Sequence, residues 1–264
     1  MAESDRRVEW VLGSALCMLL GARSARAAGG EVNVARGMAQ QGQGLKGQLD
    51  IDGGGTTGNS ELWQLKAGLS LAYEAPPHSA LLSLSAAYAE HEGTALAEQL
   101  GSHGHYRYRL LENLALEAYV NSSHDKFAGL DIQFSAGPDV VLLFEVDALR
   151  VDVGLGYMWQ YERYGRVTGP LAGEHDLAHR AQLYVFLKYD LAENLELIEH
   201  AFYLPRLDSP GPRDYMFISA SSLSIQLNPW LSYQNSFNVS FDTPPPVNTK
   251  ALNTELTAGL ALKF

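Results

Sequence analysis

Four adjacent residues, Ser122, Ser123, His124 and Asp125, are of the types that supply a nucleophile, a base and an orienting acid. A hydrolytic triad needs these groups within hydrogen-bonding reach of one another. Neighbouring residues of an extended chain point in opposite directions, so their contiguity argues against a working triad. We therefore predict that the protein is not an enzyme, and we assign no catalytic residue.

Histidines are the other candidates for chemistry, because imidazole binds transition metals. His103 and His105 stand two positions apart, so on an extended strand they would share a face and could chelate one ion. No second pair of ligands accompanies them, and we interpret His91, His103, His105, His175 and His179 as solvated loop residues. We expect no metal and no cofactor, since no phosphate-binding glycine loop or nucleotide motif is present.

Charged residues recur at alternate positions of apolar segments, where they would line one common face. They could form a polar pore whose charges select solutes, or a salt-bridge network that fills the interior. Gly68, Gly137, Gly154, Gly156 and Gly259 on the same face would leave space, which slightly favours a narrow channel. The candidate lining residues are Lys66, Arg107, Arg109, Glu117, Asp131, Asp139, Arg150, Asp152, Arg180 and Lys188, with Lys46, Asp50, Asp52, Glu74, Glu162 and Glu255.

Strands must position these side chains, because strict alternation of apolar and polar residues dominates the chain from Leu45 onward. The alternation predicts an all-β fold, a transmembrane antiparallel up-and-down barrel of twelve strands. Segments 195–204 and 215–227 alternate too weakly to assign their faces. The predicted strands lie near 45–53, 60–74, 79–90, 104–111, 114–123, 130–142, 148–162, 178–190, 195–204, 215–227, 230–242 and 251–264.

The connections between these segments alternate in length, which is typical of outer-membrane barrels. Tight turns are predicted at 75–78, 111–113, 143–147, 191–194 and 228–229, and longer polar loops at 53–59, 90–104, 123–129, 163–177, 205–214 and 242–250. Aromatic residues on the apolar face would form two girdles at the membrane interfaces. We place Trp63, Tyr88, Tyr106, Trp159 and Tyr161 near the long-loop rim, and Tyr73, Tyr189 and Phe264 near the short-turn rim.

The last segment ends in an aromatic residue after apolar residues spaced by two. This resembles the assembly signal of Gram-negative outer-membrane proteins, and it favours lipid over a soluble core as the neighbour of the apolar face. Lipid offers no hydrogen bonds, so every strand edge must be paired and the barrel must close. The residues of this predicted signal are Leu256, Ala258, Leu260, Leu262 and Phe264.

The N-terminus has the order of a secretory signal: Arg6 and Arg7, an apolar run over 11–20, and small residues at Ala25 and Ala27. The apolar run is too short to span a membrane. We predict a signal peptide at 1–27, a flexible periplasmic segment at 28–42 and a barrel domain at 43–264. The single cysteine, Cys17, would be removed with the signal, which leaves no disulfide.

Several stretches together carry a family resemblance. They are GNSE at 58–61 leading into LWQLKAGLSLAYE, YRYRLLENLALEAY at 106–119, HDKFAGLDIQFSAGPDVVLL at 124–143, and FDTPPPVNTK at 241–250 before the terminal TAGLALKF. Residues 45–264 thus resemble the salt-induced outer-membrane protein family, also called domain of unknown function 481. Pro138 departs from the expected pattern. The resemblance implies an outer-membrane barrel, but it implies no activity because the family's own function is unknown.

We therefore expect an integral barrel in the outer membrane of a Gram-negative bacterium, reached by signal-directed export. Its expected partners are the lipid bilayer, the barrel-assembly machinery and small polar solutes. The net charge of −11 argues against nucleic acid. The favoured function is a narrow channel for small polar solutes, tied to envelope or salt stress by the family name. The alternatives are a plugged structural or partner-docking barrel and, less favoured, an outer-membrane hydrolase.

Overall fold

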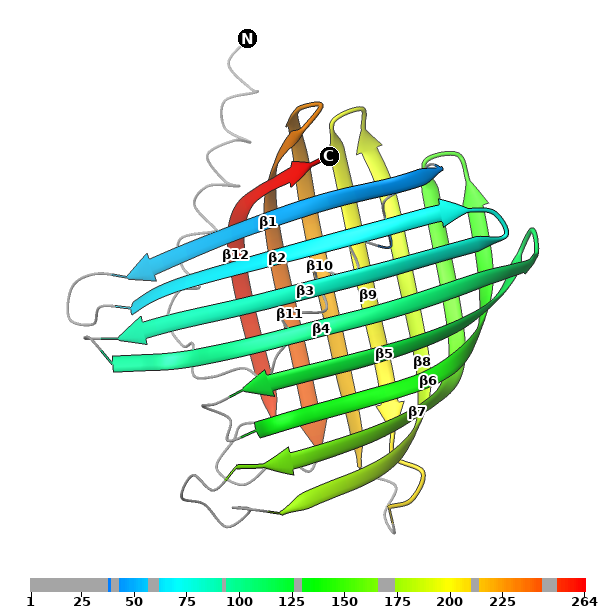
Figure 1. Ribbon diagram of the computed structural model, residues 1–264. Coiled ribbons are helices and arrows are strands. Elements are labelled where there is room, and N and C mark those ends of the chain that lie inside the picture. Colours follow the sequence, from blue (N-terminus) through cyan, green and yellow to red (C-terminus); the bar gives the residue numbers. More distant parts are fainter. Residues whose placement is uncertain are drawn as a thin grey trace, which may run out of the picture.

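The computed structural model describes residue 38 and residues 43–56, 62–91, 94–125, 130–165, 174–209, 214–243 and 251–264. Almost all of these residues lie in twelve strands (Figure 1). Among them, no helix is long and apolar enough to cross a membrane. The strands are β1 Gly44–Thr56, β2 Leu62–Ala75, β3 His78–His91, β4 Thr94–Leu111, β5 Leu114–Asp125, β6 Leu130–Val146, β7 Leu149–Tyr164, β8 His175–Ala192, β9 Leu195–Pro205, β10 Tyr215–Asn228, β11 Leu231–Thr243 and β12 Leu252–Lys263.

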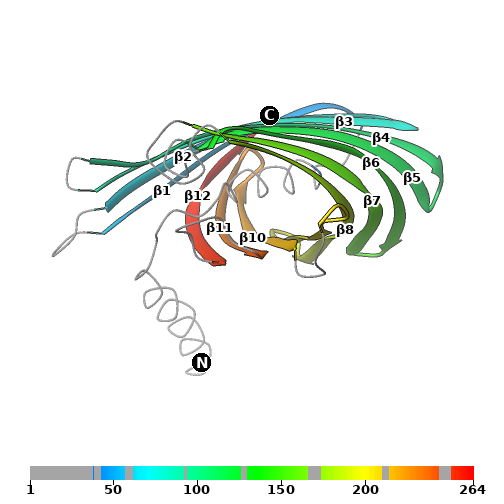
Figure 2. The same ribbon diagram turned by 90° about the horizontal axis from the view of Figure 1, so that it is seen from below.

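Each strand pairs antiparallel with its neighbour in sequence, and β1 pairs with β12 to close the barrel. The predicted fold class and strand number are therefore confirmed. Seen from below, β3–β6 and β10–β12 form opposite walls around the lumen (Figure 2). The closing seam is short: β1 and β12 pair from Gln48 with Lys263 to Gly53 with Ala258. At its end Gly47 and Phe264 exchange two backbone hydrogen bonds of 2.8 and 2.9 Å.

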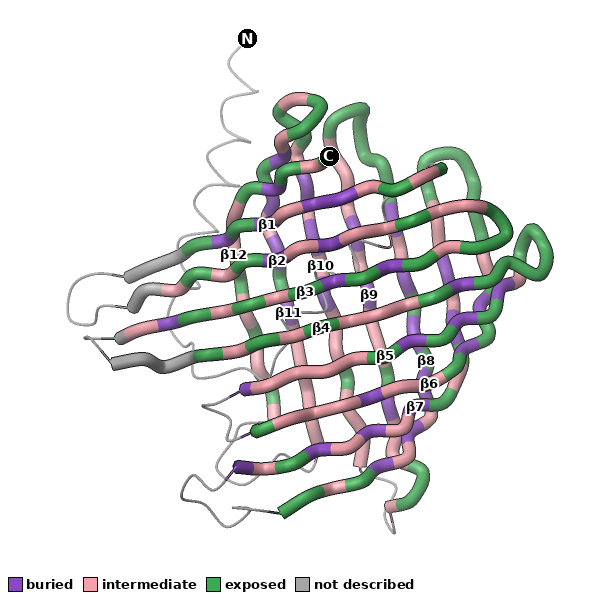
Figure 3. Tube along the Cα trace, viewed as in Figure 1, coloured by how far each residue is buried: buried purple, intermediate pink, exposed green. Residues whose placement is uncertain are grey.

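Buried and exposed residues alternate along the strands, as Figure 3 shows. In β7, Asp152 is fully buried on the inner face while Leu155 is 64 % exposed on the outer face. This is the inverse of a soluble barrel, since the polar side chains point inward. Two apolar clusters nevertheless lie inside, one around Phe186 and Ile198 and one around Tyr119, Met158 and Leu204.

The structure corrects the predicted loop at 90–104. Strand β3 ends at His91 and β4 already begins at Thr94, so β4 is much longer than the predicted 104–111. Residues 94–104 alternate poorly, and pairing with β3, such as Leu100 with Ala86, decides their conformation instead. Tyr106 consequently lies at the short-turn rim, where its hydroxyl is 2.6 Å from His78 Nδ1, and not at the long-loop rim.

The structure also fixes the faces of β9 and β10. Ile198, His200 and Leu204 of β9 are buried inside, and Glu199 pairs in register with Ser221 of β10 on the outer face. The alternation looks weak in the sequence because apolar side chains point inward here while a glutamate and two serines point outward.

Candidate functional site

The lumen collects most of the charged residues that the sequence analysis singled out. The register places Lys66, Arg107, Arg109, Glu117, Asp139, Arg150, Asp152, Arg180 and Lys188 on the inner face of their strands. Asp131 does not join them: a register shift in β6 leaves its side chain 48 % exposed at the long-loop rim, 3.6 Å from Arg163 Nε. Whether these side chains select solutes stays a prediction.

Glu117 of β5 is the centre of the buried network. Arg107 Nε donates a hydrogen bond to one carboxylate oxygen, and Tyr184 of β8 donates to the other at 2.5 Å. His105 Nε2 lies 3.1 Å from that second oxygen. Since β5 and β8 are not neighbouring strands, the Tyr184 side chain crosses the lumen to reach its partner.

Further contacts cross the lumen in the same direction. Arg107 Nη2 lies 2.8 Å from Asp152 of β7, which also accepts a 2.7 Å hydrogen bond from Arg150. Tyr119 of β5 donates to Gln182 of β8 at 2.8 Å, and Gln182 in turn donates to Asp139 at 2.9 Å. Glu117, Arg107 and Asp152 are paired and hydrogen-bonded, which is what makes burial of such charges tolerable. Among the residues that the structure describes, Asp139 has no ion-pair partner, and its hydrogen bond comes from the neutral Gln182.

Four glycines of the inner face have no room for a side chain. A Cβ built on Gly154 would lie 2.0 Å from the Tyr184 ring, and one on Gly156 would lie 1.9 Å from Asp139 Oδ1. A Cβ on Gly259 would lie 2.0 Å from Asp52 Oδ1, and one on Gly137 would lie 1.8 Å from the backbone carbonyl oxygen of Tyr157. The prediction that the inner-face glycines leave open space is therefore wrong for these four. The crowding comes from the neighbouring strand: Gly154 pairs in register with Tyr184, and Gly156 pairs with Asp139.

We expect Gly154→Ala to destabilise the barrel by about 1–3 kcal/mol, because the new methyl group overlaps the buried Tyr184 ring. Urea unfolding followed by tryptophan fluorescence measures the change. Gly53→Ala is the matched control, since its nearest neighbouring atom is 3.9 Å away, and it should shift stability by less than about 0.5 kcal/mol. Equal effects of the two substitutions would contradict the packing of Tyr184 on Gly154.

The histidines are placed differently from the prediction. His103 and His105 are not solvated loop residues: they lie on the inner face of β4 with ring centroids 6.0 Å apart. His200, which the sequence analysis missed, is 2 % exposed, and its ring centroid is 5.5 Å from Tyr184 and 4.2 Å from Phe202. The only sign of a buried His200 in the sequence is that it stands beside the apolar residues of β9. Within the described ranges, no group of three potential ligands could hold a metal ion.

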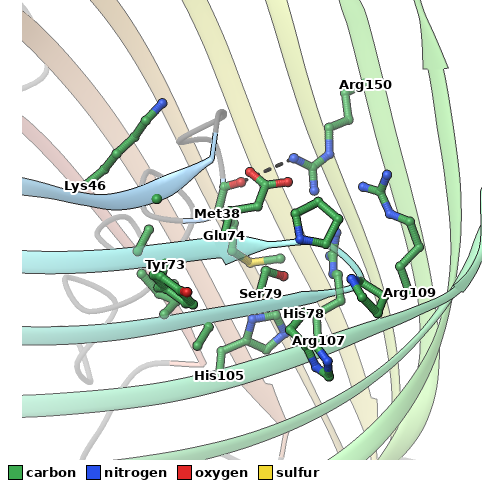
Figure 4. Close-up of a pocket in the computed structure, with 16 residues that line it drawn as sticks. Met38, Lys46, Tyr73, Glu74, His78, Ser79, His105, Arg107, Arg109 and Arg150 are labelled. Atoms are coloured by element: carbon green, nitrogen blue, oxygen red, sulfur yellow. Dashed lines mark hydrogen bonds between the residues drawn. The ribbon is translucent and has the colours of Figure 1, made fainter.

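A small basic cavity of about 70 Å³ opens at the short-turn end of the lumen (Figure 4). Arg150 on its wall donates to the backbone carbonyl of Met38 at 3.4 Å. No ion pair links Lys46 or Arg109 to another residue in the described part of the chain. The cavity thus has excess positive charge and suits a small anion. It is lined by the charged residues Lys46, Glu74, Arg107, Arg109 and Arg150 and by His105.

A second charged cluster, which the sequence analysis missed, lies at the long-loop rim. Arg206, just past β9, donates to both oxygens of Asp176 at 2.9 and 3.0 Å and to Asp208 at 2.9 Å. Desolvation opposes ionisation of Asp208, but the hydrogen bonds from Arg206 and from backbone amides, together with the charge of Arg206, hold the pKa of Asp208 below its ordinary value. This cluster joins the connection after β9 to the start of β8.

The four residues Ser122 to Asp125 separate onto two faces. Ser123 donates to Gln133 at 3.1 Å and Asp125 accepts from Gln99 at 2.7 Å, both on the inner side. His124, on the outer side, bonds through Nδ1 to the backbone carbonyl of Asp131 at 2.8 Å. This separation is what the alternation predicts, and it brings no nucleophile, base and acid together.

The sequence matches the model of a family described as protein of unknown function, DUF481, over residues 51–264. A comparison with curated proteins finds no significant match. An outer-membrane channel from Pseudomonas putida F1 is similar in fold, with a TM-score of 0.53 and 13 % identity over 85 % of this chain and 97 % of that one. The NanC porin has a TM-score of 0.50 and 7 % identity over 81 % and 98 % of the two chains. The family match covers most of the sequence, and the chain belongs to the DUF481 family of proteins of unknown function.

Proposed function

We propose that the protein is an integral outer-membrane barrel whose lumen is closed by its own side chains. In this function the barrel wall and the long loops have a structural or partner-docking role in the outer membrane, and solutes do not diffuse freely through the barrel. The observation that carries the proposal is the Tyr184 side chain, which reaches through the lumen from β8 past β7 and β6 to donate a hydrogen bond to Glu117 on β5. The structure thus favours the plugged alternative over the open channel that the inner-face glycines suggested.

Membrane placement is supported by the outer face. Leu65, Leu155 and Leu227 are more than half exposed on it, and a soluble monomer rarely leaves so large an apolar face in water. Aromatic residues mark both ends of this face: Tyr73, Tyr108 and Tyr189 toward the short turns, and Tyr88 and Tyr203 toward the long loops. The names of both similar solved structures, an outer-membrane channel and a porin, agree with this placement.

Export and assembly are part of the same proposal. The predicted signal at 1–27 lies outside the described residues, as do all but Met38 of 28–42, and most of the triple-proline loop. We propose that the signal directs export, and that the barrel-assembly machinery reads Leu256, Ala258, Leu260, Leu262 and Phe264. The link to envelope or salt stress, which rests on the family name, stays a prediction.

The basic cavity favours a second candidate function, a narrow channel for small anionic solutes. Lys46, Arg109 and Arg150 would attract an anion to the short-turn end, and Arg107 would meet it further along β4. In this case the network around Glu117 would be the constriction that sets selectivity.

Single-channel recording of the refolded mature protein in a planar bilayer tests the proposal. We expect no conductance steps from the wild type, with the shift in gel mobility on boiling as the control for folding. Tyr184→Ala removes a contact across the lumen and should produce discrete steps, whereas Tyr189→Ala, on the outer face of the same strand, should stay silent. Anion-selective steps from the folded wild type would overturn the closed lumen and establish the second candidate.

A further inference from the structure

A polar cluster interrupts the apolar outer face of β9 and β10. Ser219 donates a hydrogen bond to Glu199 Oε1 at 2.6 Å, and Ser221 donates to Glu199 Oε2. Their outer-face neighbours in the register are apolar, Leu187 on β8 and Val239 and Phe237 on β11. We call Glu199, Ser219 and Ser221 the Glu199 cluster.

The Glu199 cluster lies away from both rims. Toward the long loops it is followed by Tyr203 and Tyr215, whose ring centroids are 5.5 Å apart. Toward the short turns it is followed by Leu197, which pairs with Tyr189. The cluster therefore sits between the two aromatic rows, at the depth where the proposed membrane placement puts hydrocarbon.

A second polar side chain faces outward two strands away. Asn235 of β11 pairs with Leu223 of β10, and its side-chain oxygen accepts a hydrogen bond from Tyr233 at 3.2 Å. No acceptor for its amide nitrogen is found among the residues that the structure describes. The outer face of β9–β11 thus carries spare acceptor capacity at Glu199 and a spare donor at Asn235.

Polar groups at this depth need partners that lipid chains cannot supply. A carboxylate has about four lone-pair sites, and the two serines use only part of them. A second copy of the same face supplies the missing partners, because a two-fold axis presents the acceptor of each copy to the donor of the other. Small residues at the centre, Ala201, Ser219 and Ser221, allow two walls to approach closely, as small residues do between membrane helices.

We propose that the outer face of β9–β11 is a two-fold interface between two copies of this chain, in which Glu199 accepts a hydrogen bond from the partner's Asn235. The inference rests on the proposed membrane placement of the outer face. Because β10 lies between the two polar strands, the axis runs between the two copies in front of β10, beside Leu223.

Sedimentation in a mild detergent tests the interface. We expect a dimer for the wild type and for Glu199→Gln, which keeps an acceptor at this position. Glu199→Leu and Asn235→Leu should each give monomers that still fold, because both substitutions place an apolar group on the outer face. A Glu199→Leu protein that remains a dimer would overturn the proposed contact.

Cross-linking tests the symmetry independently. In a Cys17→Ser background, Leu223→Cys should form a covalent dimer with a short bis-maleimide, and Leu116→Cys, on β5, should not. Failure of Leu223→Cys to cross-link in a protein that sediments as a dimer would exclude the two-fold arrangement. If the protein folds as a monomer and inserts into liposomes, the dimer is excluded but the membrane placement stands. If the protein does not enter liposomes, the membrane placement itself is contradicted.

Discussion

Arg107→Met should destabilise the barrel by about 3–5 kcal/mol, the loss expected when one partner of a buried charge pair is removed. Arg107 is 6 % exposed and contacts both Glu117 and Asp152. Methionine keeps much of the volume but leaves two buried carboxylates short of positive charge. The loss is measured as the change in free energy of unfolding in urea, in vesicles or in detergent micelles.

Arg109→Met is the matched control, because Arg109 stands two residues further on the same strand and face and is exposed. It should change stability by less than about 0.5 kcal/mol. A triple variant that also carries Glu117→Gln and Asp152→Asn should recover much of the lost stability, since no buried charge is then left unpaired. If Arg107→Met behaves like Arg109→Met, the network does not hold the lumen together.

Leu155→Arg should destabilise the barrel by about 2–4 kcal/mol in a lipid bilayer, the cost of arginine near the membrane midplane. Leu155 is 64 % exposed on the outer face in the middle of β7. The same substitution at Leu149, at the short-turn end of β7, should cost only about 0–1 kcal/mol. Unfolding in vesicles measures both. A Leu155→Arg protein as stable as the wild type would mean that this face does not meet hydrocarbon.

The alternation in β7 was enough to predict its faces, because every residue from Leu149 to Glu162 except Met158 obeys a period of two. The alternation failed to predict the strand at 94–104, where pairing with β3 decides the conformation in spite of a poor local pattern. The alternation could not assign the two faces of β9, because His200 and two apolar neighbours point inward while Glu199 points outward. Local patterns assign faces only where the two sides of a strand meet different surroundings.

The buried network was beyond the reach of such patterns. Tyr184 and Glu117 are 67 residues apart, and only the closure of the barrel brings them together. The alternation put Gly154 on the inner face but could not show that the Tyr184 ring covers it. The sequence pattern therefore predicts the strands that form the barrel wall well, but it predicts the packing of side chains inside the lumen poorly.

The short seam between β1 and β12 has a consequence for the order of folding. Gly47 and Phe264 meet near opposite ends of the chain, so this contact has close to the largest sequence separation that the fold allows. Contacts of high sequence separation form slowly, because the intervening chain must first be ordered. Hairpins such as β7–β8 can form locally, whereas the seam can close only once the intervening strands have curled far enough to bring β12 beside β1. An unclosed sheet with two free edges is thus the natural late intermediate of this chain, and the seam is where unfolding should begin.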